Sequence, residues 1–174
     1  MDARFGFIHE QIEIKILILF ILMRLPEPVS TDELADIALC DDGISYFDFI
    51  EGLSDLVSTE HVEYDGEKYA ITEKGIRNGK ITETGIPYSV RIKADSRAAQ
   101  LRGTMNRNSL INTSRTIRRK GGYTVSLSLS DGIDNIISVE LLAANNKQAE
   151  ELEKGFRKNA EKIYSDFIKL ILDE

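Results

Sequence analysis

The sequence predicts an α+β fold, because two different hydrophobic periods follow one another along a chain of 174 residues. Apolar residues recur every three or four positions in residues 44–58 and again in residues 146–173, as in helices. Between them, YTVSLSLS alternates apolar and polar residues, which is typical of a strand with one buried face. Asp-Gly pairs at 65–66 and 131–132 each stand between alternating segments and predict β-hairpins. The 42% apolar content is sufficient for a buried core.

Three helices are expected before the first hairpin. Segment 8–24 is apolar on all sides, which predicts a helix buried on more than one side and ended by Leu25-Pro26. Pro28-Val29-Ser30 then predicts a short strand, and TDELADIALC predicts a second helix capped by Thr31. A third helix is expected over residues 44–58, whose buried face comprises Tyr46, Phe49, Ile50, Leu53, Leu56 and Val57.

The stretch VEYDGEKYAITEKG completes the N-terminal module. Asp65-Gly66 predicts a type I′ turn between strands 62–64 and 68–71, since both central positions of that turn need a positive φ. Three helices followed by a two-stranded hairpin is the order of a winged helix-turn-helix, whose third helix usually enters a DNA groove. We therefore predict an N-terminal winged helix-turn-helix domain over residues 1–75.

Residues 76–174 are predicted to form an α+β domain for dimerisation or ligand sensing. A short helix capped by Thr72 comes first, and Pro87 begins a longer one. INTSRTI, YTVSLSLS and NIISVELLAA then form a small antiparallel β-sheet, joined by a Gly-Gly turn and by Asp131-Gly132. A long C-terminal helix over residues 146–173 is expected to cover the apolar face of this sheet.

Composition limits the classes of function. The formal charge of −7 disfavours general attraction to nucleic acid or anionic lipid, so any such binding must be local. Cys40 is the only cysteine, which leaves no intrachain disulfide and no cysteine-based zinc site, as in a reducing compartment. The longest apolar run, residues 16–23, is far short of the roughly 20 residues that span a bilayer, and no signal peptide is recognisable. We expect a cytoplasmic protein.

No catalytic or metal-binding constellation is expected. His9 and His61 are far apart and lack metal-ligand spacing to other donors, so each is interpreted as a surface or capping residue. Cys40 ends an apolar helical stripe and is interpreted as a small buried hydrophobe. Gly121-Gly122 lacks the following helix that a phosphate-binding loop needs. We therefore predict that the chain is not an enzyme and holds no cofactor or metal.

The segment YFDFIEGLSDLVSTEHVEYDGEKYAITEKG is similar to PadR/MarR-like winged-helix transcriptional regulators. In those proteins the third helix leads into a wing that closes with a Tyr-x-Ile/Leu-Thr-x-x-Gly pattern, here Tyr69, Ile71, Thr72 and Gly75. Nearly the whole chain resembles a functionally uncharacterised clostridial winged-helix family, through Ile86-Pro87, GGYTVSLSLS and KNAEKIYSDFIKLIL. The resemblance implies the fold and a role in transcription regulation, and it carries over no ligand, operator or catalytic residue.

The predicted third helix is acidic opposite its core stripe, where it carries Asp48, Glu51 and Asp55. Groove-reading helices ordinarily bring basic or amide side chains to DNA, whereas no Lys or Arg occurs between residues 24 and 68. A solvated acidic face on a scaffold helix is an equally good interpretation. If DNA is bound, the available contacts are Ser45 and Tyr46 at the start of the helix, although Tyr46 also fits the core stripe, and Lys68 on the wing.

Basic charge is concentrated in residues 91–120, which contain nine Lys or Arg and one acid. The formal charge of this segment is +8, against −15 for the remainder of the chain. One interpretation is that these residues pair with acidic surfaces of the same protein or of a second subunit. The other is a patch that contacts phosphates, with Arg115, Arg118, Arg119 and Lys120 as the candidates.

Three hypotheses follow. The first is a transcriptional regulator that binds double-stranded DNA as a homodimer, with segment 8–24 and the C-terminal helix forming the dimer core. The alternative is a winged-helix protein-protein interaction module, in which the acidic third helix docks a basic protein partner and DNA is not bound. The third is a small-molecule sensor in the C-terminal half, although the residues of its pocket are equally explained as core.

Overall fold

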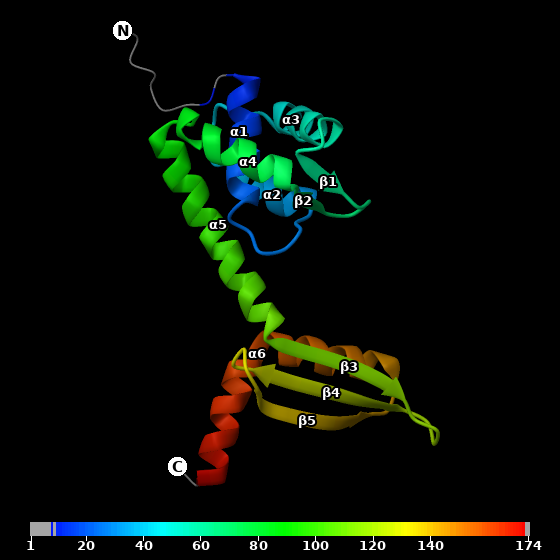
Figure 1. The fold of residues 1–174 in the computed structure, drawn as a ribbon. Coiled ribbons are helices and arrows are strands. Elements are labelled where there is room, and N and C mark those ends of the chain that lie inside the picture. The colour runs from blue at the N-terminus through cyan, green and yellow to red at the C-terminus, as the bar shows by residue number, and fades with distance from the viewer. Residues whose placement is uncertain (1–7, 9, 173–174) are drawn as a thin grey trace. The chain divides into compact units, whose positions relative to one another are not determined.

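The computed structural model describes residues 8 and 10–172, and its elements form a mixed α+β fold (Figure 1). The chain divides into two compact units, Met1–Met105 and Asn106–Glu174. Each unit has its own buried cluster of apolar side chains. The two units are therefore described separately.

The first unit begins with helix α1 (Gln11–Leu22), followed by α2 (Thr31–Ala38) and α3 (Tyr46–Ser58). Helix α1 contacts α2, α3 and α4, and it is buried from Leu17 to Leu22, as its apolar circumference predicts. Because these residues fill the core of the unit, the expectation that segment 8–24 forms a dimer core is wrong. His9 lies outside the described residues.

Helix α2 is capped by Ser30 rather than by Thr31. The Ser30 side-chain oxygen accepts a hydrogen bond from the backbone N–H of Glu33, and the Glu33 carboxylate accepts one from the N–H of Ser30. Each group thus satisfies a backbone donor that the first turn leaves free. The predicted cap was one residue too late, since Ser and Thr are both good caps and stand next to each other.

Strands β1 (Val62–Tyr64) and β2 (Tyr69–Ile71) form the predicted antiparallel hairpin. Its turn is a four-residue loop rather than type I′, because Gly66 has a positive φ of 102° while Asp65 does not. The Asp65 carboxylate instead accepts the backbone N–H groups of Glu67 and Lys68 at 2.9 and 2.7 Å. An aspartate that binds the backbone two and three residues ahead stabilises this longer turn.

Two helices and a single turn of 3-10 helix follow the hairpin: α4 (Glu73–Thr82), η1 (Glu83–Gly85) and α5 (Tyr88–Ser109). The predicted cap of α4 is confirmed, since the Thr72 oxygen accepts the N–H of Gly75. A Cβ at Gly75 would overlap the carbonyl oxygen of His61, so glycine lets α4 lie directly against the start of β1.

The first unit extends beyond the predicted boundary at residues 75 and 76. Its core includes side chains of α5 and of the residue before it, namely Ile86, Val90, Ala94, Ala98 and Met105. The division between the units therefore falls within helix α5 rather than in a loop.

The second unit is a three-stranded antiparallel sheet with one long helix. Strands β3 (Ile111–Ile117), β4 (Tyr123–Ser130) and β5 (Asn135–Ala143) lie in the order β3-β4-β5, as predicted. Helix α6 (Asn146–Leu172) contacts all three strands. The apolar row of β4 packs against α6 in a core that includes Val125, Leu127, Leu129, Ala149, Phe156 and Ala160.

Within residues 8 and 10–172, no helix has the length and apolar character required to cross a bilayer.

Candidate functional site

Ser45 occupies a structural position at the start of α3. Its side-chain oxygen accepts the backbone N–H of Asp48 at 3.1 Å and donates to the Asp48 carboxylate at 2.6 Å. These are the contacts of an N-cap. The predicted DNA contact at Ser45 thus coincides with the cap of the helix.

Two aromatic side chains beside this cap are exposed to solvent. Phe47 is 75% exposed and Tyr46 is 53% exposed. The Tyr46 ring lies 6.1 Å from the ring of Phe49, so it rests on the edge of the core. Its assignment to the buried stripe is wrong, because Tyr46 is the first residue of α3 and only one side of its ring meets the core.

One of the three acids on the outward surface of α3 is paired with a base. Asp55 forms an ion pair with Lys15 at 2.6 Å, whereas Asp48 accepts a hydrogen bond from the neutral hydroxyl of Ser45. Glu51 is exposed and has no ion-pair partner among the described residues. The exposed ridge of the helix runs through Phe47, Glu51, Ser54 and Ser58.

The β1–β2 hairpin is ordered by stacking of two tyrosines. The rings of Tyr64 and Tyr69 lie 4.5 Å apart, and the Tyr64 hydroxyl donates to the carbonyl oxygen of Gly66. Lys68 is exposed here beside three exposed carboxylates, Glu63, Asp65 and Glu67. The N–H groups of Lys68 and Glu67 hold the pKa of Asp65 below its ordinary value, so this carboxylate remains charged. The hairpin is therefore net acidic.

A basic surface on α4 was missed in the sequence. Lys74, Arg77 and Lys80 are exposed on this helix, and the Lys74 ammonium donates to the Thr59 carbonyl at 2.7 Å, at the end of α3. The signal was present as three basic residues at intervals of three within a predicted helix. They are the first basic residues in the sequence after the β1–β2 hairpin, and Lys74 contacts the end of α3.

His61 joins α3, β1 and α4 through a hydrogen-bonded chain. Its Nε2 accepts from the Asn78 side-chain amide at 2.7 Å, so the ring proton resides on Nδ1, which donates to the Thr59 hydroxyl at 2.9 Å. The Thr59 hydroxyl in turn donates to the carbonyl of Asp55. Partial burial, and then the charge of Lys74, lower the pKa of His61.

Several basic residues of segment 91–120 bind groups within their own unit, as the pairing interpretation predicts. Arg97 donates to a backbone carbonyl of α2. Arg107 donates twice to the Glu161 carboxylate, at 2.6 and 2.7 Å, which lowers the pKa of Glu161 and raises that of Arg107. Arg115 lies 3.2 Å from the carboxylate of Glu150.

Arg118, Arg119 and Lys120 differ from these residues. They are exposed on the turn between β3 and β4, and none has an ion pair among the described residues. The turn closes with Gly121 and Gly122, whose φ values of 87° and 78° suit glycine. We call residues 118–120 the basic tip. Arg115 is not part of the basic tip, because it lies within the β3–β4 ladder and is paired with Glu150.

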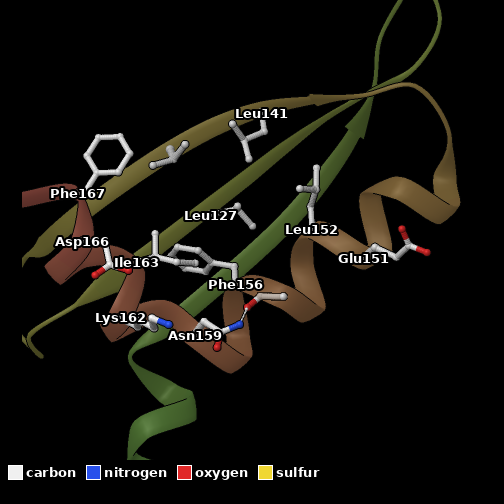
Figure 2. A pocket seen from close by; sticks show the side chains of 12 residues that line it. Leu127, Leu141, Glu151, Leu152, Phe156, Asn159, Lys162, Ile163, Asp166 and Phe167 are labelled. Carbon is white, nitrogen blue, oxygen red and sulfur yellow. Dashed lines mark hydrogen bonds between the residues drawn. The ribbon is translucent and has the colours of Figure 1, made fainter. Parts of the chain in front are cut away.

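A groove of about 560 Å³ lies between α6 and strands β4 and β5 (Figure 2). Its walls are mainly apolar and include Leu127, Val139, Leu141, Leu152, Phe156 and Ile163. Charged side chains stand among its lining residues, namely Glu151, Lys162 and Asp166. We call it the sheet groove.

The sheet groove lies beside a break in α6. Asn159 has non-helical φ and ψ of −125° and 17°, and its side-chain amide donates to the Gly155 carbonyl at 3.0 Å. A side chain that takes the place of the backbone donor is a recognised cause of a helix kink. Lining residues of the groove come from α6 on both sides of this break.

The described residues contain no group of three or more His, Cys, Asp or Glu side chains that could hold a metal ion. Cys40 is buried, and desolvation raises the pKa of its thiol above the ordinary value. A buried thiol with a raised pKa is a poor nucleophile.

Comparison with protein families matches residues 14–171 to a family described as Domain of unknown function (DUF4364). The match covers most of both units. No curated protein and no solved structure matches the chain.

Proposed function

The chain belongs to the DUF4364 family, and we propose that it is a winged-helix transcriptional regulator that binds double-stranded DNA, chiefly through the basic tip. The order of elements in the first unit supports the winged helix. Val29, which lies between α1 and α2, exchanges two backbone hydrogen bonds with Tyr69, at 3.0 and 2.7 Å. This isolated bridge joins the segment before α2 to the β1–β2 hairpin.

The basic tip is the observation that carries the proposal of DNA binding. Three adjacent cationic side chains are exposed on the turn between β3 and β4, and neighbouring residues contribute no acid to that turn. Binding to phosphates requires Lys or Arg that are free to replace counterions. Arg107 and Arg115 do not meet that requirement, because each is already paired with a glutamate.

In this proposal the two units make different contributions. The basic tip supplies phosphate contacts, which are independent of sequence. Lys74, Arg77 and Lys80 on α4 are a second, weaker source of positive charge. Helix α3 and the wing offer Tyr46, Ser54 and Ser58 for contacts and little charge, so we expect weak affinity with a strong dependence on salt.

The test is binding of a random-sequence DNA duplex at low salt, measured by fluorescence anisotropy. We expect an Arg118→Glu/Arg119→Glu variant to bind the duplex at least ten-fold more weakly. The slope of log K against log salt concentration should become less steep by about two. The matched control is Lys154→Glu/Lys158→Glu, which makes the same change of charge on exposed residues of α6.

The control separates a local site from the effect of net charge. If the tip variant and the control lose affinity equally, the tip is not the site. If the unmodified chain does not bind the duplex at micromolar concentration in low salt, where nonspecific binders do bind, the proposal fails.

A second candidate function is docking of a basic protein partner on α3. The observation that favours it is the exposed aromatic pair Tyr46 and Phe47 next to Glu51, in a segment without Lys or Arg between residues 24 and 68. Exposed aromatic side chains with a charged rim are typical of protein interfaces. DNA of like charge would be repelled by the same surface.

This second function is tested with a labelled Lys-rich amphipathic peptide as the probe. Phe47→Ala and Glu51→Lys should each weaken binding several-fold, while Glu27→Lys, an exposed acid outside α3, should not. Equal losses in all three variants would show general attraction between opposite charges and no docking site.

A further inference from the structure

The last turns of α6 are apolar around the helix. Residues 167–172 read FIKLIL, with Lys169 as the one charged residue, and Leu170, Ile171 and Leu172 are 61–76% exposed. Phe167 and Ile168 are exposed as well. A helix that is apolar on every side is normally covered by other protein. We call residues 167–172 the apolar end.

The sheet groove lies in the same unit as the apolar end and has the opposite shape. Phe167 belongs to both, since it lines the groove where the apolar end begins (Figure 2). The groove presents apolar walls from β4, β5 and α6 that no other described element covers. One unit therefore carries an apolar projection and an apolar hollow side by side.

We propose that a second copy of this chain covers both surfaces, with the apolar end of each copy lying in the sheet groove of the other. In a dimer with two-fold symmetry, the same surface of each copy faces the other copy. The apolar end of each copy can therefore fill the groove of its partner. The five exposed apolar side chains alone present on the order of 500 Å² per copy, and the groove walls add to this, against the roughly 800 Å² that a standard interface buries on each side. The inference does not depend on DNA binding.

Lys169, the one charged residue of the apolar end, has acidic counterparts in the groove. The lining of the groove carries two acids, Glu151 and Asp166, against one base, Lys162, while Asp173 and Glu174 follow the apolar end in the sequence. Neither Lys169 nor any of the three charged lining residues has an ion pair among the described residues. In the proposed pair, Lys169 of each copy meets the acidic lining of the groove opposite, which favours a second copy over an occupant without a basic group.

The first test is the mass of the full chain in solution, measured by sedimentation equilibrium over a range of concentrations. The unmodified chain should be a dimer, and Leu170→Glu/Ile171→Glu should raise its dissociation constant at least 100-fold, since two apolar side chains are lost from each of two equivalent sites. The control is Ile133→Glu, which changes an 89% exposed residue of the β4–β5 turn and should leave the mass unchanged.

A monomeric unmodified chain, or a dimer that survives in the Leu170→Glu/Ile171→Glu variant, would overturn the proposal. Both replaced residues are exposed in the unit, so circular dichroism should show that the variant remains folded. If the variant and the unmodified chain have the same helix content, the change of mass is due to loss of the interface and not to unfolding.

The second test mixes two variants that each reverse one charge. Glu151→Lys makes the groove lining positive, and Lys169→Glu makes the apolar end negative, so each variant alone brings like charges together. We expect the dissociation constant of each variant dimer to be about five-fold higher than that of the unmodified chain. An equimolar mixture of the two variants should recover the original dissociation constant, because in the mixed dimer each end and the groove it enters carry opposite charges. A mixture no tighter than the weaker variant would contradict the exchange of apolar ends.

Discussion

Ser45 closes the N-terminus of α3 through two hydrogen bonds with Asp48. Replacing Ser45 with Ala should lower the free energy of unfolding by about 1 kcal/mol, the usual effect of losing an N-cap. Ser54→Ala, on the exposed ridge of the same helix, should leave it nearly unchanged. Denaturant titration followed by circular dichroism measures both.

The same variants also show whether Ser45 has a second role. A Ser45→Ala protein that keeps its stability and loses affinity for DNA would make Ser45 a contact residue rather than a cap.

His61 makes the stability of the first unit depend on pH. Its pKa is lowered in the folded chain, so the unfolded chain takes up a proton at higher pH. The contribution of His61 to the free energy of unfolding should therefore be complete above about pH 6.5, the usual pKa of histidine. It should be lost as the pH falls from there through the pKa of His61 in the folded chain. Protonation also removes the acceptor for the Asn78 amide.

The measurement is denaturant unfolding at a series of pH values between about 8 and 5, for the unmodified chain and for His61→Gln. The variant should lose part of this dependence. His9 and all carboxylates are present in both proteins, so the difference between the two curves belongs to His61, and identical curves would refute its role.

Individual elements differed in how well the sequence predicted them. The Asp65-Gly66 and Asp131-Gly132 turns were predicted because glycine and aspartate act within a few residues of themselves. The turn type at Asp65 was wrong, since hydrogen bonds from two backbone N–H groups to its carboxylate favour a longer loop. Local chemistry located the hairpin, and contacts of a particular side chain determined its shape.

The kink in α6 illustrates what periodicity does not reveal. Apolar residues at spacings of three and four continue from Phe156 through Ile163 to Phe167, so the pattern predicts one uninterrupted helix. The interruption comes from Asn159, whose amide binds the Gly155 carbonyl. The sequence suggested a pocket between the apolar sheet face and this helix, with the same residues equally explained as core, and it gave no sign of the break beside the groove.

Asn159→Ala should straighten α6 at this point. Alanine removes the side-chain hydrogen bond to the Gly155 carbonyl and has the higher helix propensity, so the free energy of unfolding of the second unit should rise by about 0.5 kcal/mol. Self-association should weaken, because the groove depends on the kink. Thermal unfolding and sedimentation measure the two effects, with Lys158→Ala as the neighbouring control, and unchanged association would separate the groove from the kink.

The candidate phosphate contacts show the same limit on prediction. Arg115 and Arg118 look alike in the sequence, yet Arg115 reaches Glu150 while Arg118 lies beyond the last strand pair, Ile117 with Tyr123. Which arginine is paired depends on the register of β3 and on α6, residues far away in the chain. The division into units was missed for a related reason, because it falls inside a continuous helix.

At the scale of the whole molecule, charge is divided unevenly between the units. Residues 1–105 contain 19 acidic and 11 basic residues, a formal charge of −8, whereas residues 106–174 contain 10 acidic and 11 basic residues, a charge of +1. An anionic ligand is therefore attracted to the second unit and repelled by the first. Cationic partners experience the reverse.

Two separate cores predict that unfolding is not a single step. We expect calorimetry to resolve two transitions, one for each apolar cluster. Leu53→Ala should shift only the transition of the first unit and Leu129→Ala only that of the second, each by the equivalent of about 2–5 kcal/mol. A shift of both transitions by either variant would show that the two units unfold together.

The basic tip has a consequence that concerns proteases rather than ligands. Arg118, Arg119 and Lys120 are three successive cleavage sites for trypsin, displayed on an exposed turn whose glycines offer little steric hindrance. Limited digestion should therefore cut the chain first between β3 and β4, where the antiparallel ladder still holds the two fragments together. Protection of these three bonds by a bound molecule would report occupancy of the tip without any label.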